Sequence, residues 1–267
     1  MLDIFDFRIQ TPYKWRLFEM DAKGIFSTIK IFGTKESVVN LDAKNDIIKK
    51  YCTDKDVLHV GCTDSPQTEM SWKQGNFLHF QLEQIAKSIV GIDLDAKSIG
   101  FLRQQGINNI VEMNAENITL TQKFDVIVAG DIIEHMNNPG LFLEQVPGLL
   151  NREGLLVISV PIAFSFVSVL YAWLAGKERI HKDHCFYFSP KTLATLCSRY
   201  DLLPVSLFFV NQKSKLATNK TGGKLGIRLV NLSREILVKL SPFTATQIIM
   251  AFKKSSETDT TTYIELQ

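Results

Sequence analysis

The chain has 267 residues, of which 45% are hydrophobic and 22% charged, and its formal net charge is +2. This length and composition predict one globular α/β domain with a sizeable buried core. The near balance of 30 basic and 28 acidic residues lacks the basic surface typical of DNA- and RNA-binding proteins, so we expect no nucleic-acid partner.

The cysteines and the N-terminus favour a cytoplasmic protein. The four cysteines lie far apart and form no CxxC pair, which indicates reduced thiols rather than disulfides or a zinc site. The first ten residues, MLDIFDFRIQ, contain Asp3 and Asp6 where a secretory signal would be basic and then apolar. The longest apolar stretch, residues 162–175, is shorter than the roughly 20 residues needed to span a bilayer.

Strand-like and helical segments alternate through most of the chain. Short β-branched runs bounded by Gly, Asp or Asn predict strands, and the segments between them are helical in character. This alternation predicts a doubly wound, mostly parallel seven-stranded sheet, whose ligand lies beyond the carboxyl ends of the strands. The seven strands are expected at residues 57–60, 88–92, 110–113, 124–129, 155–160, 204–210 and 247–252, and helices at 77–87, 96–105 and 140–150.

Segments outside this alternation predict a cap over the sheet. Residues 1–45 are expected to form an N-terminal cap of mixed helix and loop, and residues 46–254 the domain proper. Two insertions interrupt the domain: 161–185 is aromatic and apolar, and 212–243 is basic with an amphipathic helical pattern. The Thr-rich residues 255–267 are expected to form a flexible tail.

Small and polar residues follow the first four expected strands. The carboxyl ends of parallel strands meet at one edge of a sheet, where a carboxylate can accept hydrogen bonds from a ribose diol and a glycine lets the backbone approach a ligand. These residues are Gly61, Cys62 and Thr63 after the first strand, Asp93 after the second, Asn114, Ala115 and Glu116 after the third, and Asp131 after the fourth.

Five motifs resemble, in order and approximate spacing, those of class I S-adenosylmethionine-dependent methyltransferases. They read VLHVGC, VGIDLD, MNAENI, FDVIVAGDIIEHMNNPGLFLEQV and GLLVISVP, and the resemblance covers residues 50–210. It is closest to the branch that includes ubiquinone-biosynthesis and glycan- or metabolite-modifying enzymes, and it implies a Rossmann-like fold with S-adenosyl-L-methionine as the cofactor. The implied contacts are Gly61 with the methionine moiety, Asp93 with the ribose, Leu94 with the adenine face, Asn114 to Glu116 with the adenine edge, and Asp131 with the methionine or the substrate.

The first loop departs from the family pattern, which is GxGxG after an acidic residue. His59 stands in place of the acid, and Thr63 and Ser65 stand in place of the later glycines. The long run 65–76 predicts a lid in which Trp72 or Phe77 closes over the cofactor. A nicotinamide-binding domain would share the architecture, but GCTDSP lacks the GxGxxG that opens into a pyrophosphate-binding helix.

Three histidines are candidates for a general base in methyl transfer to a hydroxyl. His135 follows the fourth strand, and His181 and His184 stand in RIHKDHCFYFSP, so all three are expected at the carboxyl edge of the sheet. We place His184 first because its segment is expected to cover the acceptor. His135 has a second interpretation, a hydrogen bond to nearby backbone that shapes the loop.

We expect no metal. Asp131, Glu134 and His135 with a distant histidine nevertheless resemble the ligand set of metal-dependent RNA-terminal and polyphenol methyltransferases, and oxygen and imidazole ligands suit Mg²⁺, Mn²⁺ or Zn²⁺. Asp131 stands where the RNA enzymes carry the longer Glu. The incomplete set leads us to predict activity without a metal.

The resemblance implies methyl transfer to oxygen, or less favourably nitrogen, of a small metabolite or glycan-like acceptor. The aromatic residues of 161–188 predict an apolar acceptor pocket. Segment 224–240 predicts a pocket lid or a homodimer contact, with weak membrane association as an alternative. Two other functions stay open: a membrane-associated enzyme that methylates a lipid-like quinone, and a non-catalytic partner protein with the cofactor fold.

Overall fold

The computed structural model describes most of the expected domain. The predictions for residues 1–29, for most of the 212–243 insertion and for the tail after 255 lie outside the described residues, so the lid or homodimer role of 224–240 stays a prediction. The described residues are 30–31, 34–35 and 37–40 as backbone, and 44–163, 165–178, 180–211, 236–238 and 241–255.

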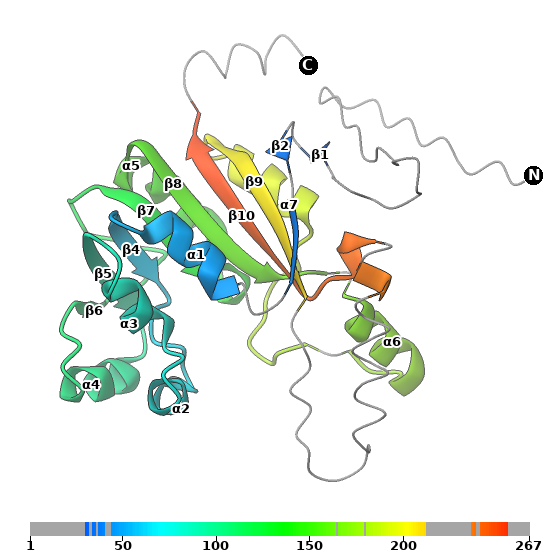
Figure 1. The fold of residues 1–267 in the computed structure, drawn as a ribbon, viewed down its shortest axis with the longest axis horizontal. Helices are drawn as coiled ribbons and strands as arrows, with labels where there is room; N and C mark the ends of the chain where they lie inside the picture. The colour runs from blue at the N-terminus through cyan, green and yellow to red at the C-terminus, as the bar shows by residue number, and fades with distance from the viewer. Residues whose placement is uncertain are drawn as a thin grey trace, which may run out of the picture.

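A mostly parallel sheet forms the centre of the molecule (Figure 1). Its order is β3-β9-β10-β8-β7-β4-β5-β6, and β10 runs antiparallel to both of its neighbours. Seven of these strands match the expected ones: β4 (Asp56–Val60), β5 (Ser88–Asp93), β6 (Ile110–Glu112), β7 (Phe124–Gly130), β8 (Leu150–Pro161), β9 (Leu202–Asn211) and β10 (Gln247–Lys254).

An eighth strand, β3 (Ser37–Asn40), was not expected. We predicted mixed helix and loop for residues 1–45, whereas the described parts between residues 30 and 40 are short strands and a helix begins at Lys44. β3 pairs in parallel with β9, and β1 (Lys30–Ile31) pairs with β2 (Thr34–Lys35) in a separate sheet. The run SVVN is short and partly β-branched, and it pairs with an edge of β9 that would otherwise offer open backbone groups.

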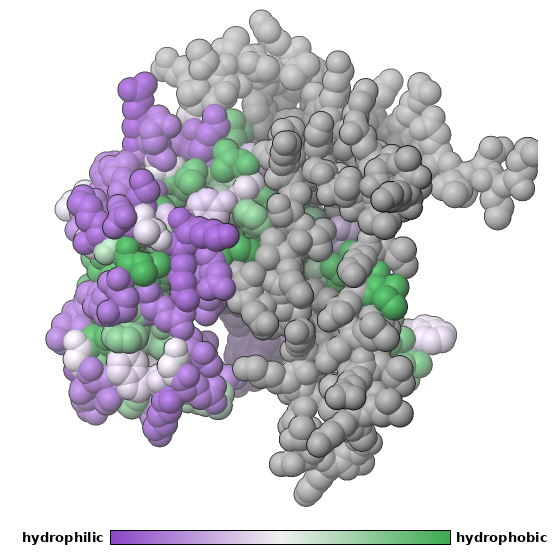
Figure 2. Space-filling view, in the orientation of Figure 1, coloured by the Kyte–Doolittle hydropathy of each residue, from purple (hydrophilic) through white to green (hydrophobic). Residues whose placement is uncertain are grey.

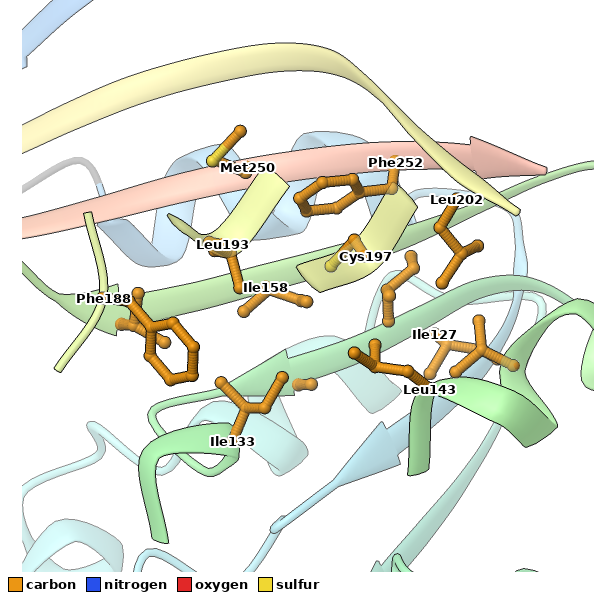
Figure 3. Close-up of a cluster of buried hydrophobic side chains, with 14 of the residues drawn as sticks. Ile127, Ile133, Leu143, Ile158, Phe188, Leu193, Cys197, Leu202, Met250 and Phe252 are labelled. Carbon is orange, nitrogen blue, oxygen red and sulfur yellow. The ribbon is translucent and has the colours of Figure 1, made fainter. Parts of the chain in front are cut away.

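Helices cover both faces of the sheet. Along β4 the side chains alternate, so that Leu58 and Val60 join the apolar cluster under α5 and α7, whereas Val57 joins the cluster under α1 and α3. Figure 3 shows the first cluster, in which Leu193 and Cys197 meet the side chains of β8 and β10. The helices are α1 (Lys44–Cys52), α2 (Thr68–Lys73), α3 (Leu78–Glu83), α4 (Ala96–Gln104), α5 (Pro139–Leu149), α6 (Phe166–Ala175) and α7 (Pro190–Ser198).

The insertion after β8 contains α6, which has no buried residue. In the space-filling view, much of the surface over α1 to α4 is hydrophilic, whereas hydrophobic atoms reach the surface near α6 and the helical segment 236–238 (Figure 2). Within the described part of the chain, no helix is long and apolar enough to cross a membrane.

Candidate functional site

Two adjoining cavities lie at the carboxyl ends of β4, β5 and β7. The larger has a volume of about 530 Å³ and the smaller about 220 Å³. Gly61, Asp93, Ile132 and His135 line both, so the cavities form one cleft. Open α/β sheets bind ligands at this edge, and the volume suits a small molecule.

Gly61 occupies a position that only glycine fits well. Its φ is +69°, and a Cβ there would lie 2.8 Å from Cγ1 of Ile132. The backbone therefore turns out of β4 without a side chain between the two cavities. Next to it, the Cys62 side chain is buried in the cluster with Phe77 and Ile99, where burial raises the pKa of the thiol well above its usual value.

Asp93 stands at the junction of the two cavities and is held by the first loop. Thr63 donates to Asp93 Oδ2 from both its backbone N (3.0 Å) and its Oγ1 (2.9 Å), and the Asp95 backbone N donates to Oδ1 (3.0 Å). A carboxylate offers about four acceptor positions, so about one, on Oδ1, remains for a ligand. The Thr63 hydroxyl takes the position that a second ribose hydroxyl would need.

The smaller cavity has an apolar wall that fits an adenine ring. Leu94 is 63% exposed beside it, and Met113 and Ala115 complete the wall. Glu116 Oε1 accepts hydrogen bonds from the backbone N atoms of Asn137 (2.8 Å) and Asn138 (3.0 Å), which ties the loop after β6 to the loop before α5.

Asn114 lies in the same wall, and its Oδ1 accepts from the Glu116 backbone N (2.8 Å). An apolar slot for the base next to a carboxylate that accepts from the ribose suits a nucleoside, so the residues present fit S-adenosylmethionine.

Asp131 lies in the larger cavity, paired with a lysine that the sequence analysis missed. Its Oδ2 forms an ion pair with Lys44 Nζ and accepts from Gln247 Nε2 (3.1 Å), and its Oδ1 accepts from Ser159 Oγ (3.1 Å). Ser159 is a polar residue within the apolar strand β8 and Gln247 is the polar first residue of β10, so both could have been found from the sequence. Nothing in the sequence marked Lys44, because only the fold brings the start of α1 to β7.

Glu134 is buried, and its backbone is hydrogen-bonded to the loop that contains His181 and His184. Its carbonyl oxygen accepts from the backbone N atoms of Cys185 (2.8 Å) and Phe186 (3.3 Å). Burial, followed by the negative charge of Asp131, raises the pKa of the Glu134 carboxyl from 4.5 to about 8. Neither carboxyl oxygen has a hydrogen-bond partner among the residues that the structure describes.

The three candidate histidines lie together, as expected. The His135 ring centroid is 4.5 Å from that of His184 and 5.6 Å from that of His181. His135 and His181 line the larger cavity, whereas His184 lies beside them and outside its lining. His135 Nδ1 is 3.1 Å from the Asp183 carbonyl oxygen, which only accepts, so Nδ1 carries the proton.

The alternative metal set does not come together around one point. Among the described residues, the potential ligand atoms that lie within 4.8 Å of one another belong to His135, His181 and His184, without a carboxylate. Asp131 forms an ion pair with Lys44, and the Glu134 side chain is buried.

Of the two residues expected in a lid, Phe77 lines the cleft and Trp72 does not, and the expectation that the aromatic residues of 161–188 line the cleft was wrong. Trp72 does not line either cavity, and its ring packs edge-on against Phe77 and Phe80, since residues 68–73 form α2 rather than an open lid. The described aromatic residues of 161–188 also lie outside both linings: Phe188 is in the core and Trp173 is exposed. Phe77 does line the larger cavity.

Comparisons with known proteins show the family to which the chain belongs. The family model described as "Methyltransferase domain" matches residues 45–207. The chain is 25% identical over 199 residues to a ubiquinone biosynthesis O-methyltransferase of Glaesserella parasuis, covering 68% of this chain and 77% of that protein.

Solved structures share the fold. A SAM-dependent methyltransferase from Archaeoglobus fulgidus has a TM-score of 0.50 at 19% identity, covering 79% of this chain and 95% of its own. The N-methyltransferase NodS from Bradyrhizobium japonicum, in complex with S-adenosyl-L-homocysteine, has a TM-score of 0.50 at 12% identity, covering 80% and 87%. With the family model matched over more than half of its length, the chain belongs to the methyltransferase domain family and is a class I S-adenosylmethionine-dependent methyltransferase.

Proposed function

We propose that this enzyme methylates a hydroxyl oxygen of a small metabolite or glycan-like acceptor, with an amine as the less favoured acceptor. The observation that carries the proposal is the group of imidazoles at the cleft, where His135 and His181 line the larger cavity together with Asp131. Methylation of a hydroxyl requires removal of its proton, and a neutral imidazole suits that task near pH 7. The O-methyltransferase name of the Glaesserella relative also supports oxygen as the acceptor atom.

The cofactor contacts follow the two cavities. We assign Leu94 and residues 113–116 to the adenine, Asp93 to the ribose, and Gly61 with Thr63 to the methionine end. Bound S-adenosylmethionine supplies an electrophilic methyl group on its sulfonium. The larger cavity would then hold both the methionine end and the acceptor, and positioning the acceptor there supplies much of the rate.

Of the three histidines, His135 is best placed to act as the base. Its Nδ1 proton is held by the Asp183 carbonyl, so its Nε2 has a free lone pair on a ring that lines the cavity. With the cofactor's methyl group presented to the acceptor oxygen, His135 Nε2 would take the proton of the acceptor hydroxyl. His184, our first choice from the sequence, packs perpendicular to His135 and serves as a positioning residue in this scheme.

Product analysis tests the proposal. The full-length protein is incubated with S-adenosylmethionine and a panel of phenols, sugars and amines, and S-adenosylhomocysteine formation is measured with mass spectrometry of the products. We expect methyl ethers. Turnover with amines alone would overturn the assignment of oxygen.

An exposed apolar helix favours a second candidate function, methylation of a lipid-like quinone at a membrane surface. In α6, Trp173 is 80% exposed and Leu174 is 70% exposed. A helix that lies in the membrane interface buries such side chains at the level of the lipid headgroups. Access to a lipid-like acceptor would follow from this contact.

Vesicle flotation distinguishes this candidate. The wild type is expected to float with vesicles of mixed neutral and anionic lipid, and a Trp173→Ser, Leu174→Ser variant is expected to remain in the soluble fraction. Met70→Ser, at an exposed position on α2, is the matched control. A wild type that stays off the vesicles removes the second candidate and leaves the first intact.

A further inference from the structure

A chain of hydrogen bonds runs from the protein surface to the larger cavity through two stacked histidines. Glu83 at the end of α3 accepts from Asn109 Nδ2 (2.9 Å), and Asn109 Oδ1 lies 3.2 Å from His79 Nε2. His79 Nδ1 lies 3.2 Å from Nδ1 of His59, whose ring lines the cavity. The two rings are nearly parallel, with centroids 5.4 Å apart.

The sequence makes room for this contact. His59 on β4 is in register with Gly91 on β5, and a Cβ on Gly91 would lie 2.7 Å from Cε1 of His79. The same Cβ would lie 2.6 Å from Cys62 Sγ, so any larger residue at position 91 would displace the side chains of Cys62 and His79. The packing of His79, which projects from α3 onto the sheet, therefore depends on that glycine.

Chemistry fixes the direction of each hydrogen bond. The Glu83 carboxylate only accepts, so the amide nitrogen of Asn109 must face it and the amide oxygen must face His79. His79 Nε2 therefore carries its proton. Burial lowers the pKa of both histidines, that of His79 to about 4, so each ring is neutral and has one N–H. His79 Nδ1 is then the acceptor, and His59 Nδ1 must donate to it.

The remaining ring nitrogen of His59 is thus an acceptor without a proton. This nitrogen has no hydrogen-bond partner among the described residues, and it is not fully buried. It therefore opens on the cavity. Lys44, which is ion-paired with Asp131, lines the same cavity, and its charge contributes to the lowered pKa of His59. This end of the cleft therefore offers an acceptor beside a cation. Those are the partners of the ammonium and the carboxylate of an α-amino acid.

We propose that the Glu83–Asn109–His79 chain fixes the tautomer of His59, so that His59 Nε2 accepts a hydrogen bond from the ammonium group of the cofactor's amino-acid end. A neutral histidine thereby binds the ammonium group, a task that an anionic side chain could perform without a fixed tautomer. Its acceptor character depends on a carboxylate three hydrogen bonds away. The inference rests on the cofactor and is independent of the acceptor assigned above.

The tautomers can be observed directly. In full-length protein labelled with ¹⁵N-histidine, long-range ¹H–¹⁵N correlations are expected to show His59 as the Nδ1–H form and His79 as the Nε2–H form. Glu83→Lys replaces an acceptor with a donor, which turns the Asn109 amide and reverses both tautomers. Unreversed tautomers in a folded Glu83→Lys protein would overturn the chain.

Binding measurements test the consequence for the cofactor. Glu83→Lys is expected to weaken S-adenosylhomocysteine binding about tenfold or more, because His59 then no longer accepts a hydrogen bond from the charged ammonium group. Binding of 5′-methylthioadenosine, which lacks the amino-acid end, should not change. Glu69→Lys on α2 is the matched charge reversal, because Glu69 pairs only weakly with Lys73 (3.8 Å) and lies outside the chain.

Two further variants keep the test decisive. Adding Asn109→Asp to Glu83→Lys supplies a carboxylate that accepts from His79 Nε2, so it should restore both the tautomers and the affinity. His59→Phe keeps a stacked ring without the acceptor and should lose the same factor for S-adenosylhomocysteine alone. Equal losses for both ligands, or no loss for either, would refute the assignment of His59.

Discussion

Replacing Asp93 with alanine removes a carboxylate that accepts three hydrogen bonds from the protein and has about one acceptor position left. One charge-assisted bond from a ribose hydroxyl contributes about 1.5–3 kcal/mol, so its loss should weaken S-adenosylhomocysteine binding about 10- to 100-fold. Titration calorimetry measures the change. Unchanged affinity in a folded variant would remove Asp93 from the cofactor site.

The same substitution also affects folding, because the buried Thr63 loses its acceptor. Asp93→Ala should lower the free energy of unfolding by about 1–3 kcal/mol, measured by urea denaturation. Thr63→Val is the control: it removes one bond to Oδ2, costs about 1 kcal/mol of stability and opens an acceptor position for the ribose. If Thr63→Val weakened binding as much as Asp93→Ala, the position of the loop rather than the carboxylate would control affinity.

Three other predictions concern the larger cavity. His135→Ala should lower kcat by about 10²–10⁴-fold with unchanged S-adenosylhomocysteine affinity, and His184→Ala should lower it less; the opposite ranking in steady-state assays would return the role of base to His184. The raised pKa of Glu134 means that its contribution to stability is complete below 4.5 and lost as the pH rises through about 8. Glu134→Gln should therefore raise Tm relative to the wild type at about pH 8 and change it little at about pH 4.5, whereas an equal shift at both would contradict the pKa. Activity should survive EDTA, as the sequence led us to expect; loss of activity that Zn²⁺ or Mn²⁺ restores would make the three clustered histidines the metal ligands.

Most strands of the sheet could be predicted from the local sequence pattern. The strands β4, β5, β7 and β8 are apolar runs of β-branched residues between turn residues, and buried parallel strands require that composition on both faces. β3 was not predicted because a run of four residues is too short to show a strand pattern. It forms a strand because it pairs with the edge of β9.

The sequence by itself determined which residues stand at the carboxyl ends of the strands, because strand order and direction place Gly61, Asp93 and Asp131 at one edge of the sheet. Their partners were decided only by the tertiary structure. Lys44 reaches Asp131 across 87 positions of the chain, and His79 reaches His59 only because Gly91 leaves space between a strand and a helix. Hydrogen bonds and ion pairs act over a few ångströms, so they depend on the distances that packing sets and that spacing along the chain does not encode.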